Sequence, residues 1–528
     1  MRIVLTSSEA VPFSKTGGLA DVAAALPKAL AHAGHEVWLI VPHYPQAARR
    51  RGIDESSFVP IGEKVEVPIR SRLIQADILQ TKLPGTNVTT LLLHQPDYFD
   101  RHGLYQDQHG QDYPDNCERF VFFSRAVMET VQNLGLRPHV IHANDWQTGL
   151  VPALLDIQFR NLPGFEQTGS VFTIHNMAYQ GHFWHWDMEL TGLDWRYFNH
   201  HQMEFWGHLN LLKTGLVFAD AVTAVSPTYA REIQTPEYGC GLEGTLSFHR
   251  AKVTGIVNGV DTEIWNPATD PHLPENYSAR DLSGKERCKS FLQQKLGLPA
   301  RPDVPLLGMI SRMSEQKGLD LVDQSAEFLL KDEAQMAFLG TGERRYETIL
   351  ADLARRFPGK VSATIGFDEV LAHQIEAGAD MFLMPSRYEP CGLNQMYSLL
   401  YGTVPVVRSV GGLADTVVEA SEENFQAGTA NGFRCERHVP TEFYRQVYRA
   451  TKLFHHDAAR WRELMENGMR GDFSWERSAA GYVSVYEQAA GKYGYVPPAP
   501  APPVHDASQN AGNGKQHHEA RERAAQSS

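Results

Sequence analysis

Three segments of this sequence combine glycine with a cation or a carboxylate where a predicted strand passes into a predicted helix. They are Lys15-Thr16-Gly17-Gly18, Arg312 with Gln316-Lys317-Gly318, and Glu389-Pro390-Cys391-Gly392-Leu393. Backbone N–H groups at the start of a helix are free to bind an anion, and glycine lets the backbone approach it closely. These segments therefore indicate a diphosphate site. A plain glycine turn with a solvated lysine remains an alternative for the first segment, and a solvated basic loop for the second.

Glu389 places a carboxylate shortly after the apolar run 381–384. A chain leaving the carboxyl end of a parallel sheet puts such a side chain in the crevice where ligands bind. The sequence Gly-Gly-Leu-Ala-Asp occurs at residues 17–21 and again at 411–415. Two such turns predict two similar lobes whose phosphate-facing loops meet across a cleft. Cys391 is interpreted as a small buried side chain at a tight turn rather than as a nucleophile.

Two histidines lie at the ends of predicted strands, His142 close to Asn144 and Asp145, and His175 beside Asn176. A histidine in such a place is either structural or catalytic, and the sequence leaves both open. The pattern contains no recognised metal-ligand spacing and no serine nucleophile elbow. No metal site is therefore predicted.

Length, composition and charge limit the possible functions. The 528 residues suggest about two to four domains, and 42% hydrophobic with 21% charged residues is typical of a globular protein. A net charge of −13 argues against general binding of nucleic acid, which depends on lysine and arginine. The five cysteines form no C-x-x-C pair, which disfavours zinc and disulfide frameworks and indicates a reducing compartment. Without a signal-peptide pattern or an apolar run of about 20 residues, a cytoplasmic protein with no membrane span is expected.

Short apolar runs alternate with helical patterns in two series. The first extends from residues 3–6 to 253–257, and the second from 304–310 to 404–407. Such alternation indicates mostly parallel sheets with helices on their faces, so we expect an α/β protein with two Rossmann-like units. Gly340-Thr341-Gly342 lacks the third glycine of the dinucleotide fingerprint, so NAD binding is not favoured.

The chain divides at turns and at changes of composition. Residues 1–262 are expected to form a first lobe and residues 263–473 a second. Ser474 is a predicted N-cap for a final helix, residues 474–493, that returns to the first lobe. Residues 494–528 are rich in Pro and Ala and then polar, which predicts a disordered tail.

Several longer motifs follow one another along the chain. They are Lys15-Thr16-Gly17-Gly18-Leu19-Ala20-Asp21-Val22, His175-Asn176 with Ala178-Tyr179-Gln180-Gly181, Val225-Ser226-Pro227-Thr228-Tyr229-Ala230, Asn258-Gly259-Val260-Asp261, Arg312 with Gln316-Lys317-Gly318-Leu319-Asp320, and Glu389-Pro390-Cys391-Gly392-Leu393. Together they resemble the motifs of bacterial glycogen synthases and plant starch synthases, and the likeness runs from Met1 to about Tyr493.

The resemblance implies a GT-B fold, in which two Rossmann-like lobes face each other across a deep cleft. It implies transfer of glucose from ADP-glucose to the non-reducing end of an α-1,4-glucan, with retention at the anomeric carbon. The implied partners are ADP-glucose and a glycogen or malto-oligosaccharide acceptor, and no cofactor or metal is implied. The oligomeric state stays open.

Carried over by motif, the resemblance assigns roles to individual residues. The implied catalytic residues are Glu389, His175, Arg312 and Lys317. The implied substrate-binding residues are Lys15, Gly17, Gly18, Asp21, Asp145, Asn258, Cys391, Gly392 and Leu393. Arg312 and Lys317 resemble the pair that holds the diphosphate, and Glu389 resembles the carboxylate beside the glucosyl ring. Phe367 is a candidate surface for stacking of the adenine.

Two departures narrow the resemblance. Tyr397 stands where many retaining GT-B enzymes repeat a glutamate, and the synthase branch shares this departure. Residues 112–116 look closer to the starch synthase version than to the commonest bacterial one. Because a diphosphate leaving group needs little protonation, we hypothesise front-face transfer in which Glu389 orients the sugar and eases its positive charge. UDP-glucose as the donor, a non-catalytic glucan-binding homologue and a sugar-nucleotide epimerase remain alternatives.

Overall fold

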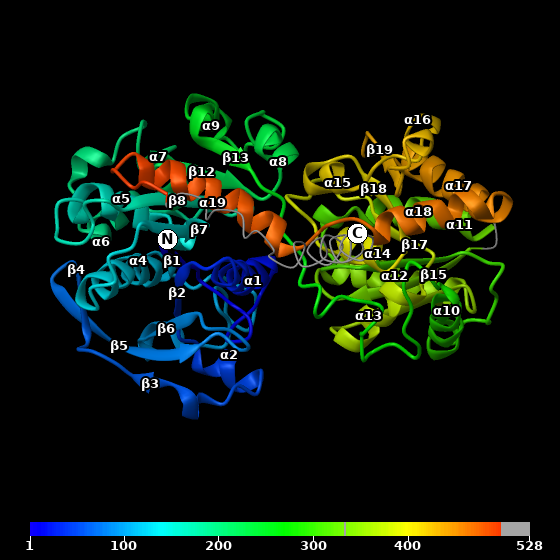
Figure 1. Ribbon diagram of the computed structural model, residues 1–528, viewed down its shortest axis with the longest axis horizontal. Helices are drawn as coiled ribbons and strands as arrows, with labels where there is room; N and C mark the ends of the chain where they lie inside the picture. The colour runs from blue at the N-terminus through cyan, green and yellow to red at the C-terminus, as the bar shows by residue number, and fades with distance from the viewer. Residues whose placement is uncertain (332–333, 498–528) are drawn as a thin grey trace, which may run out of the picture.

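The computed structural model describes residues 1–331 and 334–497, which form two halves built on separate sheets (Figure 1). The half drawn in blue to green contains the first sheet, and the half drawn in yellow-green to orange contains the second. Helices alternate with the strands in both halves. The predicted α/β fold with two Rossmann-like units is confirmed.

The first sheet has the strand order β13-β12-β8-β7-β1-β2-β6-β5-β3, with β4 paired to β5. Its strands are β1 (Arg2–Thr6), β2 (Glu36–Pro42), β3 (Val59–Pro60), β4 (Val65–Ile69), β5 (Arg72–Lys82), β6 (Thr89–His94), β7 (Val140–Asn144), β8 (Gly169–Ile174), β12 (Ala221–Ala224) and β13 (Val253–Gly255). The strands from β13 to β6 pair in parallel, whereas β5 is antiparallel to its neighbours. The central strands are almost entirely buried, which explains their continuous apolar runs.

Helices of the first half separate these strands. They are α1 (Gly18–His32), α2 (Pro45–Arg50), α3 (Pro96–Phe99), α4 (Asn116–Asn133), α5 (Leu150–Leu154), α6 (Met188–Thr191), α7 (Leu211–Phe218), α8 (Pro227–Glu232) and α9 (Glu243–Phe248). Capping fixes where α8 begins, because the Ser226 hydroxyl accepts from the Tyr229 N–H and Pro227 suits the first helical turn. A small sheet of β9 (His182–Phe183), β10 (Glu204–Phe205) and β11 (His208–Asn210) lies outside the alternation.

The second sheet is wholly parallel, in the order β16-β15-β14-β17-β18-β19. Its strands are β14 (Leu306–Ile310), β15 (Gln335–Gly340), β16 (Val361–Ile365), β17 (Met381–Met384), β18 (Val404–Arg408) and β19 (Phe433–Cys435). Its helices are α10 (Ser283–Lys295), α11 (Leu319–Lys331), α12 (Arg344–Arg356), α13 (Glu369–Gly378), α14 (Asn394–Leu400), α15 (Gly411–Thr416), α16 (Glu422–Gln426), α17 (Pro440–His456) and α18 (Ala458–Met469). In α17, Phe443, Val447 and Ala450 share one buried stripe, as expected for a helix that covers a sheet.

The last helix, α19 (Trp475–Gly491), lies over the first sheet, as its orange-red ribbon in Figure 1 shows. Ser474 caps it by accepting from the Arg477 N–H. Trp475 and Tyr482 are buried in the same apolar core as Ile3 of β1. The final helix is therefore packed within the half that contains the N-terminus.

Among residues 1–331 and 334–497, none of the helices combines the length and apolar character needed to cross a bilayer. The same residues contain no group of three or more His, Cys, Asp or Glu side chains arranged to hold a metal ion. Of the tail expected at residues 494–528, the part from residue 498 onward lies outside the described residues.

Candidate active site

The second and third glycine segments meet because β14 and β17 are neighbours in the sheet. Gly318 has φ +69°, and a Cβ on it would lie 2.0 Å from the backbone oxygen of Pro385. Only glycine permits this approach. It brings the loop after β14 against the loop after β17, with Lys317 in the first and Glu389 in the second.

Lys317 and Glu389 form a direct ion pair. The Lys317 Nζ lies 2.6 Å from the Glu389 Oε2, and the Ser386 hydroxyl donates to the same oxygen at 3.0 Å. The side chain of Glu389 is 7% exposed. The lysine and the serine thus compensate the burial of this carboxylate. Sequence reasoning selected the pair but missed Ser386, although it lies three residues before Glu389.

Arg312 lies in the same loop, beyond the end of β14. Its Nη2 donates to the Gln316 Oε1 at 3.5 Å, and Gln316 in turn donates to the Tyr388 carbonyl at 3.2 Å. Within the described part of the chain, no carboxylate pairs with Arg312. Its guanidinium therefore keeps donors for an anion, as the predicted diphosphate role requires.

The two Gly-Gly-Leu-Ala-Asp segments differ in what surrounds their glycines. A Cβ on Gly411 would lie 1.9 Å from the Glu389 carbonyl oxygen, and one on Gly412 would lie 2.0 Å from that of Cys391. A Cβ on Gly17 or Gly18 would meet no atom within 4 Å. The second segment thus packs against the backbone that carries Glu389, whereas the first leaves open space where a ligand can approach.

Cys391 and Asn258 connect the third glycine segment to the first half. A backbone hydrogen bond from Asn258 reaches the Cys391 thiol, and burial raises the pKa of that thiol to about 12. Cys391 is 5% exposed, which agrees with its interpretation as a small buried side chain. Gly392 adopts φ +73°, and Leu393 precedes the first residue of α14.

Phe367 is 86% exposed and free to stack on a base.

Glu9, which sequence reasoning missed, accepts hydrogen bonds from Thr16 of the first glycine segment and so fixes its position. Both carboxylate oxygens of Glu9 accept from the Thr16 hydroxyl, at 3.0 and 2.9 Å, and one also accepts from the Thr16 N–H. Glu9 is 2% exposed, and burial raises its pKa to about 7. Lys15 bonds to Asp21 at 2.7 Å, and both side chains are about one-third exposed. No signal in the sequence marks Glu9, because it lies in an irregular loop.

Asp145 and His175 come together because β7 and β8 pair in parallel. The Asp145 Oδ1 accepts from the His175 N–H at 2.7 Å, and the His175 Nε2 lies 2.9 Å from the Asn144 Oδ1. Asp145 has φ +56°, a strained conformation for a non-glycine residue. Burial raises the pKa of Asp145 to about 7 and lowers that of His175 to about 3. His175 is therefore neutral at pH 7 and acts as a hydrogen-bonding group rather than a cation.

His142 differs from His175 in its surroundings. It is fully buried between the hydroxyls of Tyr486 and Thr173, at 2.8 and 2.5 Å, and burial lowers its pKa to about 3. Both ring nitrogens are engaged by protein groups. Of the two histidines that the sequence left open, this one is structural and links α19 to the sheet.

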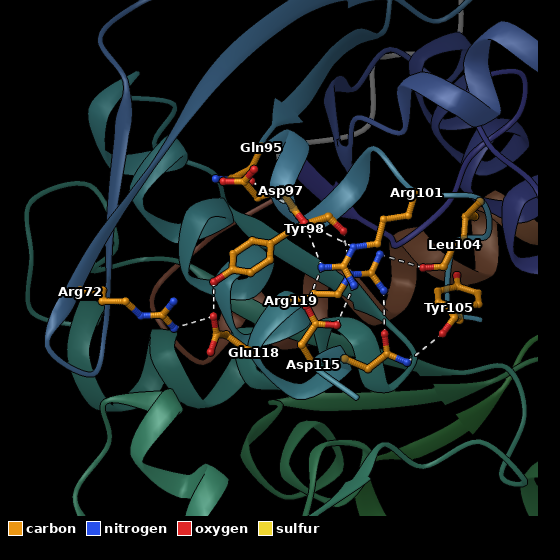
Figure 2. Close-up of polar contacts among 11 residues, drawn as sticks. Arg72, Gln95, Asp97, Tyr98, Arg101, Leu104, Tyr105, Asp115, Glu118 and Arg119 are labelled. Atoms are coloured by element: carbon orange, nitrogen blue, oxygen red, sulfur yellow. Dashed lines mark hydrogen bonds and ion pairs between the residues drawn. The ribbon is translucent and has the colours of Figure 1, made fainter. Parts of the chain in front are cut away.

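A long loop between α3 and α4 is fixed over the first half by the buried Arg119. Figure 2 shows its guanidinium, which donates to the Tyr98 carbonyl at 2.8 Å and to the Leu104 carbonyl at 3.0 Å. Arg101 pairs with Asp115 at 2.6 Å in the same network.

Tyr105 connects this loop to the residues that precede the first glycine segment. Its hydroxyl lies 2.7 Å from that of Ser8, the residue before Glu9. The segment 112–116 is therefore part of a loop that reaches the candidate site. Sequence reasoning singled out that segment but not Arg119, which positions it.

Comparisons with known proteins agree with this geometry. Residues 2–248 match the family of starch synthase catalytic domains, and residues 292–458 match glycosyl transferases group 1. The chain is 48% identical to a glycogen synthase from an Anaeromyxobacter species over 494 residues, covering 93% of this chain and 100% of that protein. It is 45% identical to glycogen synthase 1 of Methylococcus capsulatus over 493 residues, covering 93% and 97% of the two chains.

Solved structures show the same similarity to starch synthases. The catalytic domain of starch synthase IV from Arabidopsis thaliana, bound to ADP and acarbose, superimposes with a TM-score of 0.84 at 34% identity, covering 93% of this chain and 99% of that one. Sucrose-phosphate synthase from Thermosynechococcus elongatus shares the fold, with a TM-score of 0.57 at 17% identity. The GT-B architecture implied by the sequence motifs is confirmed.

Proposed function

The chain belongs to the starch and glycogen synthase family of glycosyltransferases, and on this premise we propose that it transfers glucose from ADP-glucose to the non-reducing end of an α-1,4-glucan with retention of configuration. The observation that carries the proposal is the Lys317–Glu389 pair, with Arg312 in the same loop. These groups suit a leaving diphosphate and a sugar that develops positive charge. The similar starch synthase IV structure contains ADP, which favours an adenine donor.

In this proposal the cations act on the leaving group. Arg312, Lys317 and Lys15 stabilise the negative charge that grows on the diphosphate as the glycosidic bond breaks, so no general acid is required. Such side-chain cations can supply the charge stabilisation that a metal ion supplies elsewhere. Gly17 and Gly18 leave room for the phosphates beside the start of α1.

Glu389 and the Asp145–His175 pair act on the sugars. Glu389 orients the transferred glucose and offsets its positive charge in the transition state. The departing phosphate oxygen takes the proton of the acceptor hydroxyl on the same face of the ring. His175, neutral at pH 7, offers a hydrogen bond to a sugar hydroxyl without adding charge.

We also propose that residues 1–262 and 263–473 act as two lobes that close over the donor, with residues 474–493 returning to the first lobe. The lobes meet in apolar contacts, since Cys391 and Met396 pack in the core of the first lobe, and in polar contacts that can break and re-form during closure. Asp415 accepts from the Thr228 N–H at 2.9 Å, and the Gly411 N–H donates to Glu232 at 3.1 Å. Compaction in small-angle X-ray scattering on addition of ADP and a glucan is the expected result, and an unchanged radius of gyration would contradict it.

The decisive experiment measures nucleotide release from ADP-glucose and from UDP-glucose, each with and without glycogen. Glycogen-dependent release of ADP is expected. Faster release from UDP-glucose would overturn the donor assignment and keep the reaction. Release without glycogen would favour an epimerase, and no release from either donor, with glycogen still bound, would favour the non-catalytic homologue. Glu389→Ala is the matched inactive control.

A further inference from the structure

Three tryptophans form an exposed strip on the first half of the molecule. Trp184, Trp186 and Trp195 are 58%, 45% and 40% exposed. The ring centroids of Trp184 and Trp186 are 6.4 Å apart, and those of Trp186 and Trp195 are 5.4 Å apart. Single exposed apolar side chains are common, but a contiguous patch marks a binding surface. We call these three residues the tryptophan strip.

The tryptophan strip follows directly, in sequence, a residue that is packed beside the candidate site. Phe183, which precedes Trp184, packs on Trp146 with centroids 5.6 Å apart, and Trp146 directly follows Asp145. Gly181 is pressed against the same indole, because a Cβ there would lie 2.5 Å from the Trp146 ring. The chain thus connects the tryptophan strip, through Phe183 and Trp146, to the Asp145–His175 pair.

The strip is held in place by the backbone around it. Phe183 lies in β9, paired with Leu209 of β11. Trp195 begins a short 3-10 turn that Asp194 caps by accepting from the Arg196 N–H at 2.8 Å. Because these backbone contacts fix the positions of the side chains, little conformational entropy is lost on binding.

The chemistry of the strip selects its occupant. The charged groups around it are of both signs, Asp187, Glu189 and Asp194 against Arg196 and Arg70, so neither a polyanion nor an anionic membrane is attracted. A neutral sugar chain fits, since the C–H faces of successive glucose rings lie on aromatic faces while their hydroxyls stay in water.

We propose that the tryptophan strip is an extended binding surface for an α-glucan chain, which holds the distal part of a long acceptor while its end lies at the Asp145–His175 pair. The inference rests on the proposed function for the identity of the acceptor. It assigns the strip to polymer recognition. Short acceptors that fill only the site do not use it.

Glycogen binding without donor tests the proposal directly. Trp186→Ala, in the middle of the strip, is expected to weaken retardation in glycogen-containing native gels by about fivefold, whereas Trp186→Phe keeps a ring and most of the retardation. Trp206→Ala is the matched control, because Trp206 is 80% exposed and, in the described part of the chain, its ring packs on Phe205 and not on the strip. Equal loss in the control, or full retention in Trp186→Ala, would overturn the proposal.

Kinetics and association state complete the test. The KM for glycogen is expected to rise in Trp186→Ala far more than the KM for maltotriose. Equal rises in the two KM values would mean a general disturbance of the site and would refute the role proposed for the tryptophan strip. Light scattering that shows a wild-type dimer and a Trp186→Ala monomer would assign the surface to a second copy of the chain instead. The gel assay contains no sugar nucleotide and measures glycogen binding alone. Its result therefore stays interpretable even if the protein does not catalyse the proposed reaction.

Discussion

The Nζ of Lys317 lies 2.6 Å from the Oε2 of Glu389, although the two residues are 72 positions apart. The lysine follows β14, the glutamate follows β17, and the two strands are hydrogen-bonded neighbours. A cation for the leaving diphosphate and a carboxylate for the transferred sugar therefore share one ion pair. A ligand phosphate that attracts Lys317 would alter the environment of Glu389 at the same time.

Lys317→Ala is expected to lower kcat by about 10²- to 10³-fold, because a group that stabilises transition-state charge is lost. Lys317→Arg retains the charge and is expected to recover part of the rate. Steady-state ADP release at saturating glycogen measures both. A Lys317→Ala enzyme with near-normal turnover would remove this lysine from the mechanism.

Glu9 is expected to make stability depend on pH. Burial raises its folded-state pKa from 4.5 to about 7, so the folded protein binds a proton that the unfolded chain releases. Its contribution is fully present below about pH 4.5 and is lost as the pH rises through about 7. The loss approaches about 3 kcal/mol by the linkage relation. Urea unfolding at pH 5 and pH 8 should show a smaller difference for Glu9→Gln than for the wild type, and an unchanged difference would refute this role.

Trp265 is stacked between two rings, Tyr397 at 3.8 Å and His373 at 3.9 Å between centroids, both nearly parallel. It anchors the connection between the halves to α13 and α14. Trp265→Ala is expected to lower the free energy of unfolding by about 3 kcal/mol or more through loss of packing. Tyr397→Phe keeps the stack and should cost much less. Denaturant titration compares them, and equal stability of Trp265→Ala and the wild type would contradict the inference.

Gly17 and Gly411 provide a matched pair of substitutions. Gly411→Ala is expected to destabilise the fold, because φ is +44° and the new Cβ would lie 1.9 Å from the Glu389 carbonyl oxygen. Gly17→Ala has an extended φ of −155° and open space around it, so its melting temperature should stay near that of the wild type while the KM for ADP-glucose rises. Thermal melts and donor titrations separate the two. A stable Gly411→Ala protein would show that this contact relaxes.

Much of this architecture is local in origin and was readable from the sequence. The period of apolar runs predicted most of the parallel strands of both sheets but missed β3, β4, β5 and β19. Glycine near Lys15, Lys317 and Glu389 marked the turns where backbone must come close to another group. These features depend on residues near one another in the chain, so their physical cause can be recognised from the sequence.

Tertiary structure alone decided which of these groups meet. The order β16-β15-β14-β17 makes neighbours of strands that are far apart in sequence, and this places Lys317 against Glu389. The roles of Glu9, His142 and Trp265 depend on burial and on distant partners. Desolvation and ring stacking are properties of the packed molecule, so a residue type and its spacing could not reveal them.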